Sequence, residues 1–248
     1  MTSTADKVHN YVHQFDDESP DVAKVDPRTS LANAMIVVDV QNDFTPGGSL
    51  AVEGGDEVAR RIHDYVQKFG DDYKLVVATL DWHPDSFTWP DFPHFSDNPD
   101  YVDTWPVHCV HDTDGAAWHQ NLYATAKNAQ SWADPWPPQA DQIEFDLAFY
   151  KGQMAPAYSG FEGTSPGASF DPPIGWTLNA YLKDKNIGHV DVVGLATDYC
   201  VKATALDAVK AGYDTSVLLI MCAGVHPDST EQAIKDMVAA GIHVEEED

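Results

Sequence analysis

Apolar positions along the chain fall into two recurring patterns. Continuous apolar runs of strand length occur at residues 34–40, 74–80, 143–150, 190–195, 215–220 and, more weakly, 242–246. Between these runs, apolar residues recur at helical spacing over 56–69, 175–186, 198–211 and 229–240. Strands that are apolar throughout and separated by amphipathic helices are typical of a parallel sheet covered on both faces. The pattern therefore predicts a three-layer α/β/α fold with a mostly parallel, doubly wound sheet of about six strands.

Two stretches fall outside this rhythm. Residues 1–33 are polar with little apolar periodicity, and we interpret them as an N-terminal extension to a single domain that spans residues 34–248. Within the domain, the stretch at about 81–140 is dense in Trp, Pro, His and Asp, with one expected helix near 115–128. Long irregular segments in compact domains usually carry function. We therefore expect a functional insert there.

The charge and cysteine content narrow the classes of partner. The chain has 40 acidic against 14 basic residues, a net charge of −26 that is spread along its length. Such a surface repels nucleic acid and anionic membranes, so we expect neither as a partner. Three cysteines without regular spacing do not make a disulfide framework, and the sequence has neither a signal-peptide pattern nor a run of transmembrane length. These features favour a cytoplasmic protein.

Chemically active side chains follow the apolar runs. In open parallel sheets, ligands bind at the carboxyl ends of the strands. The first four runs lead, in chain order, to Asp39, to Asp81 and His83, to Lys151, and to Cys200. An acid, a pair of metal-type ligands, a lysine and a thiol should therefore meet at one edge of the sheet.

Each of three residues has a functional and a structural interpretation. Cys200 is expected in the first turn of a helix that begins near Thr197, where N–H groups and the helix dipole lower a thiol's pKa and favour a nucleophile. Most free cysteines, however, are small buried hydrophobes. Asp39 is either a buried general base with a raised pKa or a cap of the following loop. Lys151 either holds these two groups as anions or extends to solvent.

The insert carries a set of metal-type ligands. Asp81 and His83 lie on one side of an extended segment, because side chains alternate along a strand. His94 and His108 follow in the same irregular region. One carboxylate and three imidazoles suit zinc, iron or manganese, with room for water or a substrate nitrogen.

Five blocks of the sequence together resemble the nicotinamidase (pyrazinamidase) family of isochorismatase-like cysteine hydrolases. They are VDVQNDFTPGGSLAV, TLDWHP, HFSDNPDYVDTWPVHCV, FYKGQMAPAYSGFEG and GLATDYCVKATALDAVKAGY, and the similarity spans roughly residues 34–243. Agreement of several blocks in order is more specific than any single motif. The resemblance implies an amidohydrolase of NAD salvage that converts nicotinamide to nicotinate and ammonia through a cysteine thioester, and that also accepts pyrazinamide.

The resemblance also implies roles for individual residues. The implied catalytic residues are Asp39, Lys151 and Cys200. The implied ligands of one divalent metal ion, zinc or alternatively iron or manganese, are Asp81, His83, His94 and His108. The implied substrate-binding residues are Phe44, Trp105, Tyr158 and Leu195. The Leu195–Ala196 bond is implied to be cis, with the N–H groups of Ala196 and Cys200 forming an oxyanion hole.

Several alternatives stay open at this level. The segment between His83 and His94 is longer than in close relatives, which leaves Asp85 and Ser86 as local competitors of His94. Another amidase of the superfamily, acting on maleamate or on a carbamoyl or ureido compound, would keep the Asp, Lys and Cys positions but generally lacks this histidine set. A catalytically silent binding homologue is the alternative from a different class. A homo-oligomer is compatible with every one of these functions.

Overall fold

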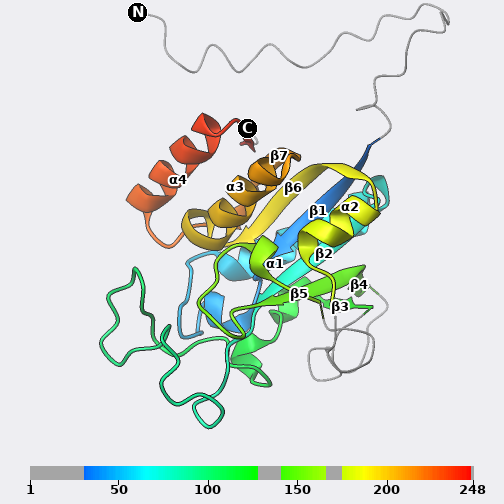
Figure 1. Ribbon diagram of the computed structural model, residues 1–248. Coiled ribbons are helices and arrows are strands. Elements are labelled where there is room, and N and C mark those ends of the chain that lie inside the picture. The colour runs from blue at the N-terminus through cyan, green and yellow to red at the C-terminus, as the bar shows by residue number, and fades with distance from the viewer. Residues whose placement is uncertain (1–30, 128–140, 166–174, 247–248) are drawn as a thin grey trace, which may run out of the picture. The chain divides into compact units, whose positions relative to one another are not determined.

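The computed structural model describes residues 31–127, 141–165 and 175–246, and strands and helices alternate along them (Figure 1). Most of the expected N-terminal extension and part of the expected insert therefore lie outside the described residues. The strands are β1 (Ala32–Val38), β2 (Leu75–Asp81), β3 (Ala124–Ala126), β4 (Ile143–Phe145), β5 (Leu147–Lys151), β6 (Ile187–Leu195), β7 (Asp214–Ala223) and β8 (His243–Glu245). The α-helices are α1 (Gly55–Phe69), α2 (Leu178–Asp184), α3 (Lys202–Ala211) and α4 (Pro227–Ala239).

Six strands form one sheet in the order β5-β2-β1-β6-β7-β8, and all neighbouring pairs are parallel. This confirms the predicted α/β fold. β1 begins at Ala32, slightly before the expected boundary. The predicted run 143–150 divides at Asp146, whose carboxylate accepts hydrogen bonds from the N–H of Val76 at 2.9 Å and from Lys127 Nζ at 2.7 Å. The part before Asp146 is β4, which pairs with β3 in a separate two-stranded sheet.

The helix expected near 115–128 is absent from the described part of that stretch. Two single 3₁₀ turns, Asp114–Ala116 and Gln120–Leu122, stand in its place and are followed by β3. Tyr123 has a φ of 43°, in the left-handed region, which ends helical geometry directly before the strand. The helical spacing was too short to compete with this local turn.

The sheet buries both of its faces. Met35 and Val37 of β1 lie in one hydrophobic cluster with Ile62 of α1, whereas Ile36 and Val38 lie in a second cluster with residues of α2, α3 and α4. Figure 1 shows α2 and α3 in front of the sheet. Each such aliphatic side chain contributes about 1.5–3 kcal/mol on burial. Alternate residues of one strand thus hold two helical layers in place.

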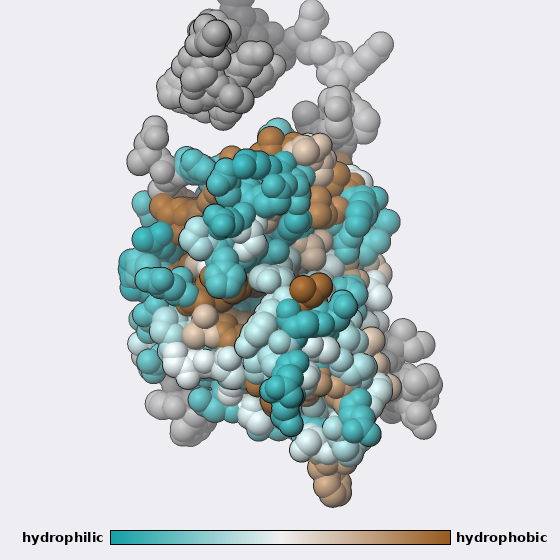
Figure 2. Space-filling view, turned by 90° about the vertical axis from the view of Figure 1, so that its left-hand side faces the viewer, coloured by the Kyte–Doolittle hydropathy of each residue, from teal (hydrophilic) through white to brown (hydrophobic). Residues whose placement is uncertain are grey.

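The outer surface follows the composition. The face in Figure 2 is mainly hydrophilic, in keeping with a net charge of −26. Among the described residues, none of the helices combines the length and the apolar character needed to cross a bilayer.

The segment 84–109 leaves the sheet after β2 and returns to the same point. The N–H of His83 donates to the carbonyl of Cys109, and the N–H of His111 donates to the carbonyl of His83, both at 2.9 Å. Within the segment, the N–H of Trp105 donates to the carbonyl of His94 at 2.9 Å. The green loops at the lower left of Figure 1 include this segment, beyond the carboxyl ends of the strands. The segment 84–109 is therefore a closed loop beyond the carboxyl ends of the strands.

Gly194 marks the closest approach of β6 to β1. It has a φ of +118°, and a Cβ there would lie 2.1 Å from the carbonyl oxygen of Val38. Gly212 also has a positive φ, +95°, but nothing lies within 4 Å of its Cβ position. We expect Gly212→Ala to lower the free energy of unfolding by about 1 kcal/mol, and Gly194→Ala by about 3 kcal/mol or more. Urea denaturation measures both, and equal losses would contradict the close contact.

His189 gives the fold a pH dependence. Its Nε2 lies 2.8 Å from Asp191 Oδ1 and its Nδ1 lies 3.3 Å from Asp214 Oδ2. The hydrogen bond to Asp191 raises the pKa of His189 above its ordinary 6.5, against an opposing effect of burial. A raised pKa stabilises the fold fully below pH 6.5, and this stabilisation disappears as pH rises through the raised value. His189→Gln should therefore lower the free energy of unfolding at pH 6 and change it little at pH 9, as measured by urea denaturation at both values.

Candidate functional site

The carboxyl ends of four neighbouring strands bring the sequence-predicted side chains together. Lys151 ends β5, Asp81 ends β2, Asp39 directly follows β1, and Cys200 lies in the turn after β6. These strands are adjacent in the sheet, and Asp81 and Lys151 are partners in its parallel register. Residues far apart in the chain therefore meet because parallel strands end at a common edge.

The Lys151 ammonium is the centre of this arrangement. Its Nζ lies 2.9 Å from Asp39 Oδ2, 2.5 Å from Asp81 Oδ1 and 3.5 Å from Cys200 Sγ. The side chain is buried, as are its partners, so its expected alternative of extending to solvent does not apply. Burial alone would lower the pKa of Lys151, but the two carboxylates and the thiol raise it well above its usual range. The lysine is therefore a permanent cation.

Asp39 is oriented by the adjacent strand. Its φ of 48° is left-handed, and Oδ1 accepts a hydrogen bond from Thr79 Oγ1 at 2.6 Å. Oδ2 is thereby directed to Lys151. Burial raises the pKa of Asp39, and the Lys151 ammonium opposes this only in part. These contacts favour a buried base over a cap of the following loop, because the Asp39 carboxylate contacts Thr79 of β2 and Lys151 of β5.

The thiol of Cys200 does not have the lowered pKa expected from its sequence position. Burial raises its pKa well above the ordinary value, and the negative charge of Asp39 raises it further against the effect of Lys151. The sequence indicated a helix start but could not show that the side chain would be only 7% exposed. The raised pKa favours the protonated thiol, and the Asp39 carboxylate is one of the charged groups around it.

The turn that carries Cys200 also differs from expectation. Thr197–Val201 is a π-helical turn, and α3 begins only at Lys202, so the thiol precedes the α-helix instead of lying in its first turn. Two N–H groups of this turn donate to one carbonyl, that of Ala196, at 3.0 and 3.1 Å. The peptide bond before Ala196 is cis, as the family resemblance implies. Single π turns occur frequently at functional sites.

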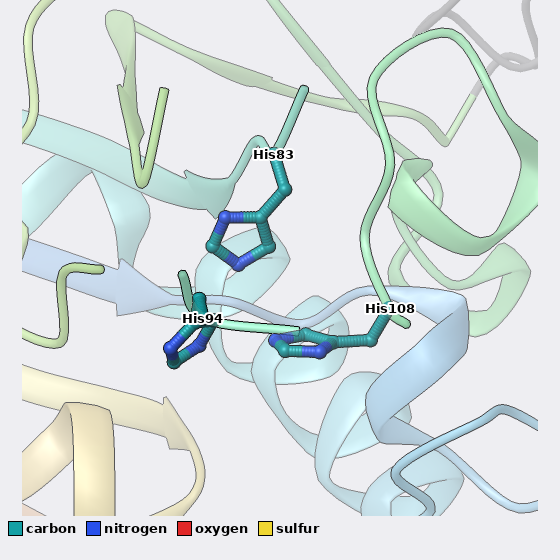
Figure 3. Close-up of side chains that lie close together, drawn as sticks. All are labelled: His83, His94 and His108. Carbon is teal, nitrogen blue, oxygen red and sulfur yellow. The ribbon is translucent and has the colours of Figure 1, made fainter. Parts of the chain in front are cut away.

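Three histidines converge beside the lysine. Ring nitrogens of His83, His94 and His108 lie within 4.8 Å of one another, and all three residues are buried (Figure 3). His83 Nδ1 lies 3.0 Å from the carbonyl of Gly152, and His108 Nδ1 lies 2.8 Å from that of Pro106. A carbonyl only accepts, so each Nδ1 is the donor, and a neutral ring then has the lone pair of its Nε2 available for a metal ion.

The nitrogen atoms of this cluster fit a divalent metal ion. His83 Nε2 and His94 Nδ1 are among the buried polar atoms of the described residues that have no hydrogen-bond partner. Burial, followed by the neighbouring imidazoles, lowers the pKa of His94 to about 4, so its ring is neutral near pH 7. Buried polar atoms without partners are costly unless a ligand binds them. Converging imidazole nitrogens are the ligands that zinc and related metals prefer.

His94, and not one of its local competitors, completes the cluster. Ser86 is exposed, and Asp85 Oδ1 accepts the N–H of Thr88 at 2.5 Å. The backbone of His94 is held by the N–H of Trp105. The longer spacing after His83 is thus absorbed in the loop without displacing the third imidazole.

Asp81 joins the histidine cluster to the lysine. Its Oδ2 lies 3.4 Å from His83 Nε2 and 3.6 Å from His108 Nε2, while its Oδ1 contacts Lys151. Burial acts to raise the pKa of Asp81, but the Lys151 ammonium and His83 together hold it well below its usual range. The carboxylate is therefore ionised, with one oxygen directed to each half of the site.

A cavity of about 280 Å³ opens beside the thiol. Its lining includes the expected residues Phe44, Trp105, Tyr158, Ala196 and Cys200. Trp105 Nε1 donates to Tyr158 Oη at 2.9 Å, which ties two of the aromatic walls together. Leu195, also expected at the substrate, lies in the hydrophobic core instead, with no exposed surface, and is not part of the lining.

Other lining residues were not found from the sequence. Tyr101, Tyr199, Val225 and His226 all face the cavity. The Tyr199 ring packs edge-on against Trp105, with centroids 5.1 Å apart. The sequence could have indicated Tyr199 as a lining residue, because it directly precedes Cys200. Val225 and His226 follow β7, which corresponds to the predicted apolar run 215–220. Ligands bind at the carboxyl ends of parallel strands, so this run would also have indicated these two residues.

Comparisons with known proteins agree with this geometry. A family model described as the Isochorismatase domain matches residues 168–247. The nicotinamidase/pyrazinamidase of Mycobacterium tuberculosis is 42% identical over 85% of this chain and 97% of that protein. The nicotinamidase of Escherichia coli is 35% identical over 84% and 92%, respectively. The crystal structure of Pyrococcus horikoshii pyrazinamidase in complex with zinc covers 87% of this chain and 99% of that chain, with 32% identity and a TM-score of 0.64.

The histidine cluster can be tested by metal binding alone. After removal of metal by a chelator, the protein should bind one Zn²⁺ per chain in a calorimetric titration, and His94→Ala should weaken binding at least about tenfold, because a ligand nitrogen is lost. His111→Ala is the matched control. His111 follows the segment 84–109 but lies outside the histidine cluster, and its Nδ1 is 2.8 Å from Asp112 Oδ2. Unchanged zinc affinity in His94→Ala would exclude it as a ligand.

Proposed function

The chain belongs to the nicotinamidase family of isochorismatase-like hydrolases, and on that premise we propose that it cleaves the amide bond of nicotinamide through a thioester on Cys200. It is an amidohydrolase that produces nicotinate and ammonia. The observation that carries the proposal is the contact of one buried lysine with a carboxylate and a thiol beside a cavity of aromatic walls.

The first step is a proton transfer within the site. Asp39 accepts the proton of Cys200, which contacts the same Lys151 ammonium, and the thiolate attacks the carboxamide carbon. The raised pKa of Asp39 suits a group that must hold this proton. It then donates the proton to the nitrogen of the leaving ammonia. Lys151 stabilises the thiolate, from which it lies 3.5 Å.

The carbonyl oxygen becomes negative as the tetrahedral intermediate forms. We assign its stabilisation to the N–H groups of Ala196, which directly precedes the turn after β6, and of Cys200, which lies within it. Donors fixed in advance are effective because they need no rearrangement as the charge develops. The cis bond before Ala196 agrees with this assignment, because the family resemblance pairs the two features.

The second half of the reaction releases the acid. A water molecule attacks the thioester carbonyl, and Asp39 takes a proton from that water as it did from the thiol. The C–S bond breaks, Cys200 recovers its proton, and nicotinate leaves through the cavity. One carboxylate therefore serves both halves of the cycle.

The ring of the substrate is held by the aromatic walls. Phe44 and Trp105 provide flat faces on the cavity, and Tyr158 is fixed to Trp105 by its hydroxyl group. A planar ring between such faces has little freedom to rotate, which keeps the carboxamide close to the thiol. Pyrazinamide has nearly the same shape, so we propose that it is also a substrate.

Asp81, His83, His94 and His108 would hold the metal ion. We propose zinc, because imidazole and carboxylate donors suit it and because the pyrazinamidase of Pyrococcus horikoshii forms a complex with zinc; iron and manganese are the alternatives. When bound, the ion supplies an electron-pair acceptor for the nitrogen of a pyridine ring. Maleamate and ureido compounds have no such nitrogen, so the histidine cluster favours ring amides over these rival substrates.

The enzyme is further proposed to work in the cytoplasm. Its three cysteines are all free, as expected in a reducing compartment. A catalytically silent homologue is not favoured, because Lys151 contacts both the acid and the thiol.

Ammonia release from a panel of amides tests the function. We expect nicotinamide and pyrazinamide to be hydrolysed faster than maleamate or N-carbamoylsarcosine, and Cys200→Ala to lower kcat at least about a thousandfold because the nucleophile is lost. Cys222→Ala is the control, since that thiol lies outside the cavity and should leave kcat unchanged. Faster turnover of maleamate or N-carbamoylsarcosine would assign the enzyme to a different amidase class.

A further inference from the structure

Asp198 lies in the π-helical turn Thr197–Val201, which is called the nucleophile turn below because it carries Cys200. The proposed reaction gives Asp198 no part. Its carboxylate does not point into the turn's own helix. Oδ1 accepts the N–H of Val225 at 2.9 Å, and Oδ2 accepts the N–H of His226 at 3.3 Å and the hydroxyl of Ser229. These three partners belong to the connection between β7 and α4 and to the first turn of α4.

The partners of Asp198 are themselves firmly held. The carbonyl of His226 accepts hydrogen bonds from the N–H of Thr230 at 2.9 Å and from Thr230 Oγ1 at 2.7 Å. A carboxylate near the start of α4 also interacts favourably with the positive end of that helix. Hydrogen bonds to an ionised acceptor are about twice as strong as neutral ones. The connection therefore offers a rigid anchor for the turn.

The nucleophile turn needs an anchor more than an α-helical turn would. Two of its N–H groups converge on the single carbonyl of Ala196, so the backbone ladder that holds an α-helix is incomplete here. Asp198 ties this turn to a second element. The same connection brings Val225 and His226 to the lining of the cavity.

We propose that Asp198 is a positioning residue that fixes the Cys200 turn against the wall formed by Val225 and His226. It sets the thiol and the N–H groups of the proposed oxyanion hole relative to the rest of the cavity. Its catalytic meaning rests on the proposed function, but its effect on the thiol does not. Without this tie, the turn should loosen, so that the buried thiol gains access to solvent while its alignment for attack is lost.

The experiment compares Asp198→Ala, Asp198→Asn and Thr177→Ala. Thr177 is the matched control, because its Oγ1 caps α2 by accepting the N–H of Ala180 at 3.2 Å and lies outside the cavity. For each protein, kcat and KM for nicotinamide, the thermal midpoint, and the rate of Cys200 alkylation by iodoacetamide are measured, the last by mass spectrometry of the Cys200 peptide.

Asp198→Ala should lower kcat about tenfold to a hundredfold, with a smaller change in KM, because misplacement of reacting groups affects the transition state most. Its alkylation of Cys200 should be several times faster than in the wild type. Asp198→Asn keeps one acceptor oxygen, so its kcat and its rate of Cys200 alkylation should lie between those of the wild type and of Asp198→Ala. Thr177→Ala should lower the thermal midpoint while leaving kcat and alkylation unchanged.

If Asp198→Ala and Asp198→Asn lose stability as Thr177→Ala does but keep wild-type kcat and alkylation, Asp198 is only a structural cap. If Asp198→Ala does not fold, the Asn variant decides by the same readouts. If the wild type releases no ammonia from nicotinamide, the proposed function fails, and the alkylation rates still decide whether Asp198 positions the thiol.

Discussion

A buried ammonium needs anions beside it, and this requirement organises the site. Taking a lysine charge out of water costs several kcal/mol unless it is matched by close, well-aligned partners. Lys151 has two, Asp81 at the end of the adjacent strand β2 and Asp39 directly after β1, the next strand in the sheet. One carboxylate faces the thiol and the other faces the histidines. The strand order β5-β2-β1-β6 is therefore the physical link between the hydrolytic half and the metal half of the site.

The same burial reconciles the raised pKa of the thiol with the nucleophilic role proposed for Cys200. Both Asp39 and Cys200 hold protons more tightly than usual, for the common reason that water is excluded from them. Transfer of a proton from the thiol to the carboxylate moves a negative charge without creating one. Desolvation therefore disfavours both sides of this transfer similarly, and Lys151 lies within reach of the charge in either place.

The sequence predicted the parts of the molecule that depend on local pattern and strand polarity. The apolar runs became strands because buried parallel strands have no polar face, and the carboxyl-end rule found Asp39, Lys151 and Cys200. It could not show how deeply the thiol is buried, since that depends on elements packed from elsewhere in the chain. The approach of Val225 was missed for the same reason, because a hydrogen bond between distant parts of the chain holds it beside Asp198.

Because the segment 84–109 closes on itself, its residues can line the cavity without contributing to the sheet. Its ends are bonded to each other at His83, Cys109 and His111, so the intervening residues enclose the cavity without carrying any strand of the sheet. Closing a longer loop costs only slightly more entropy than closing a short one. The segment 84–109 could therefore be replaced by a loop of different length or sequence without rearranging the sheet. Ring preference would diverge with it, while the lysine-centred hydrolytic machinery stayed unchanged.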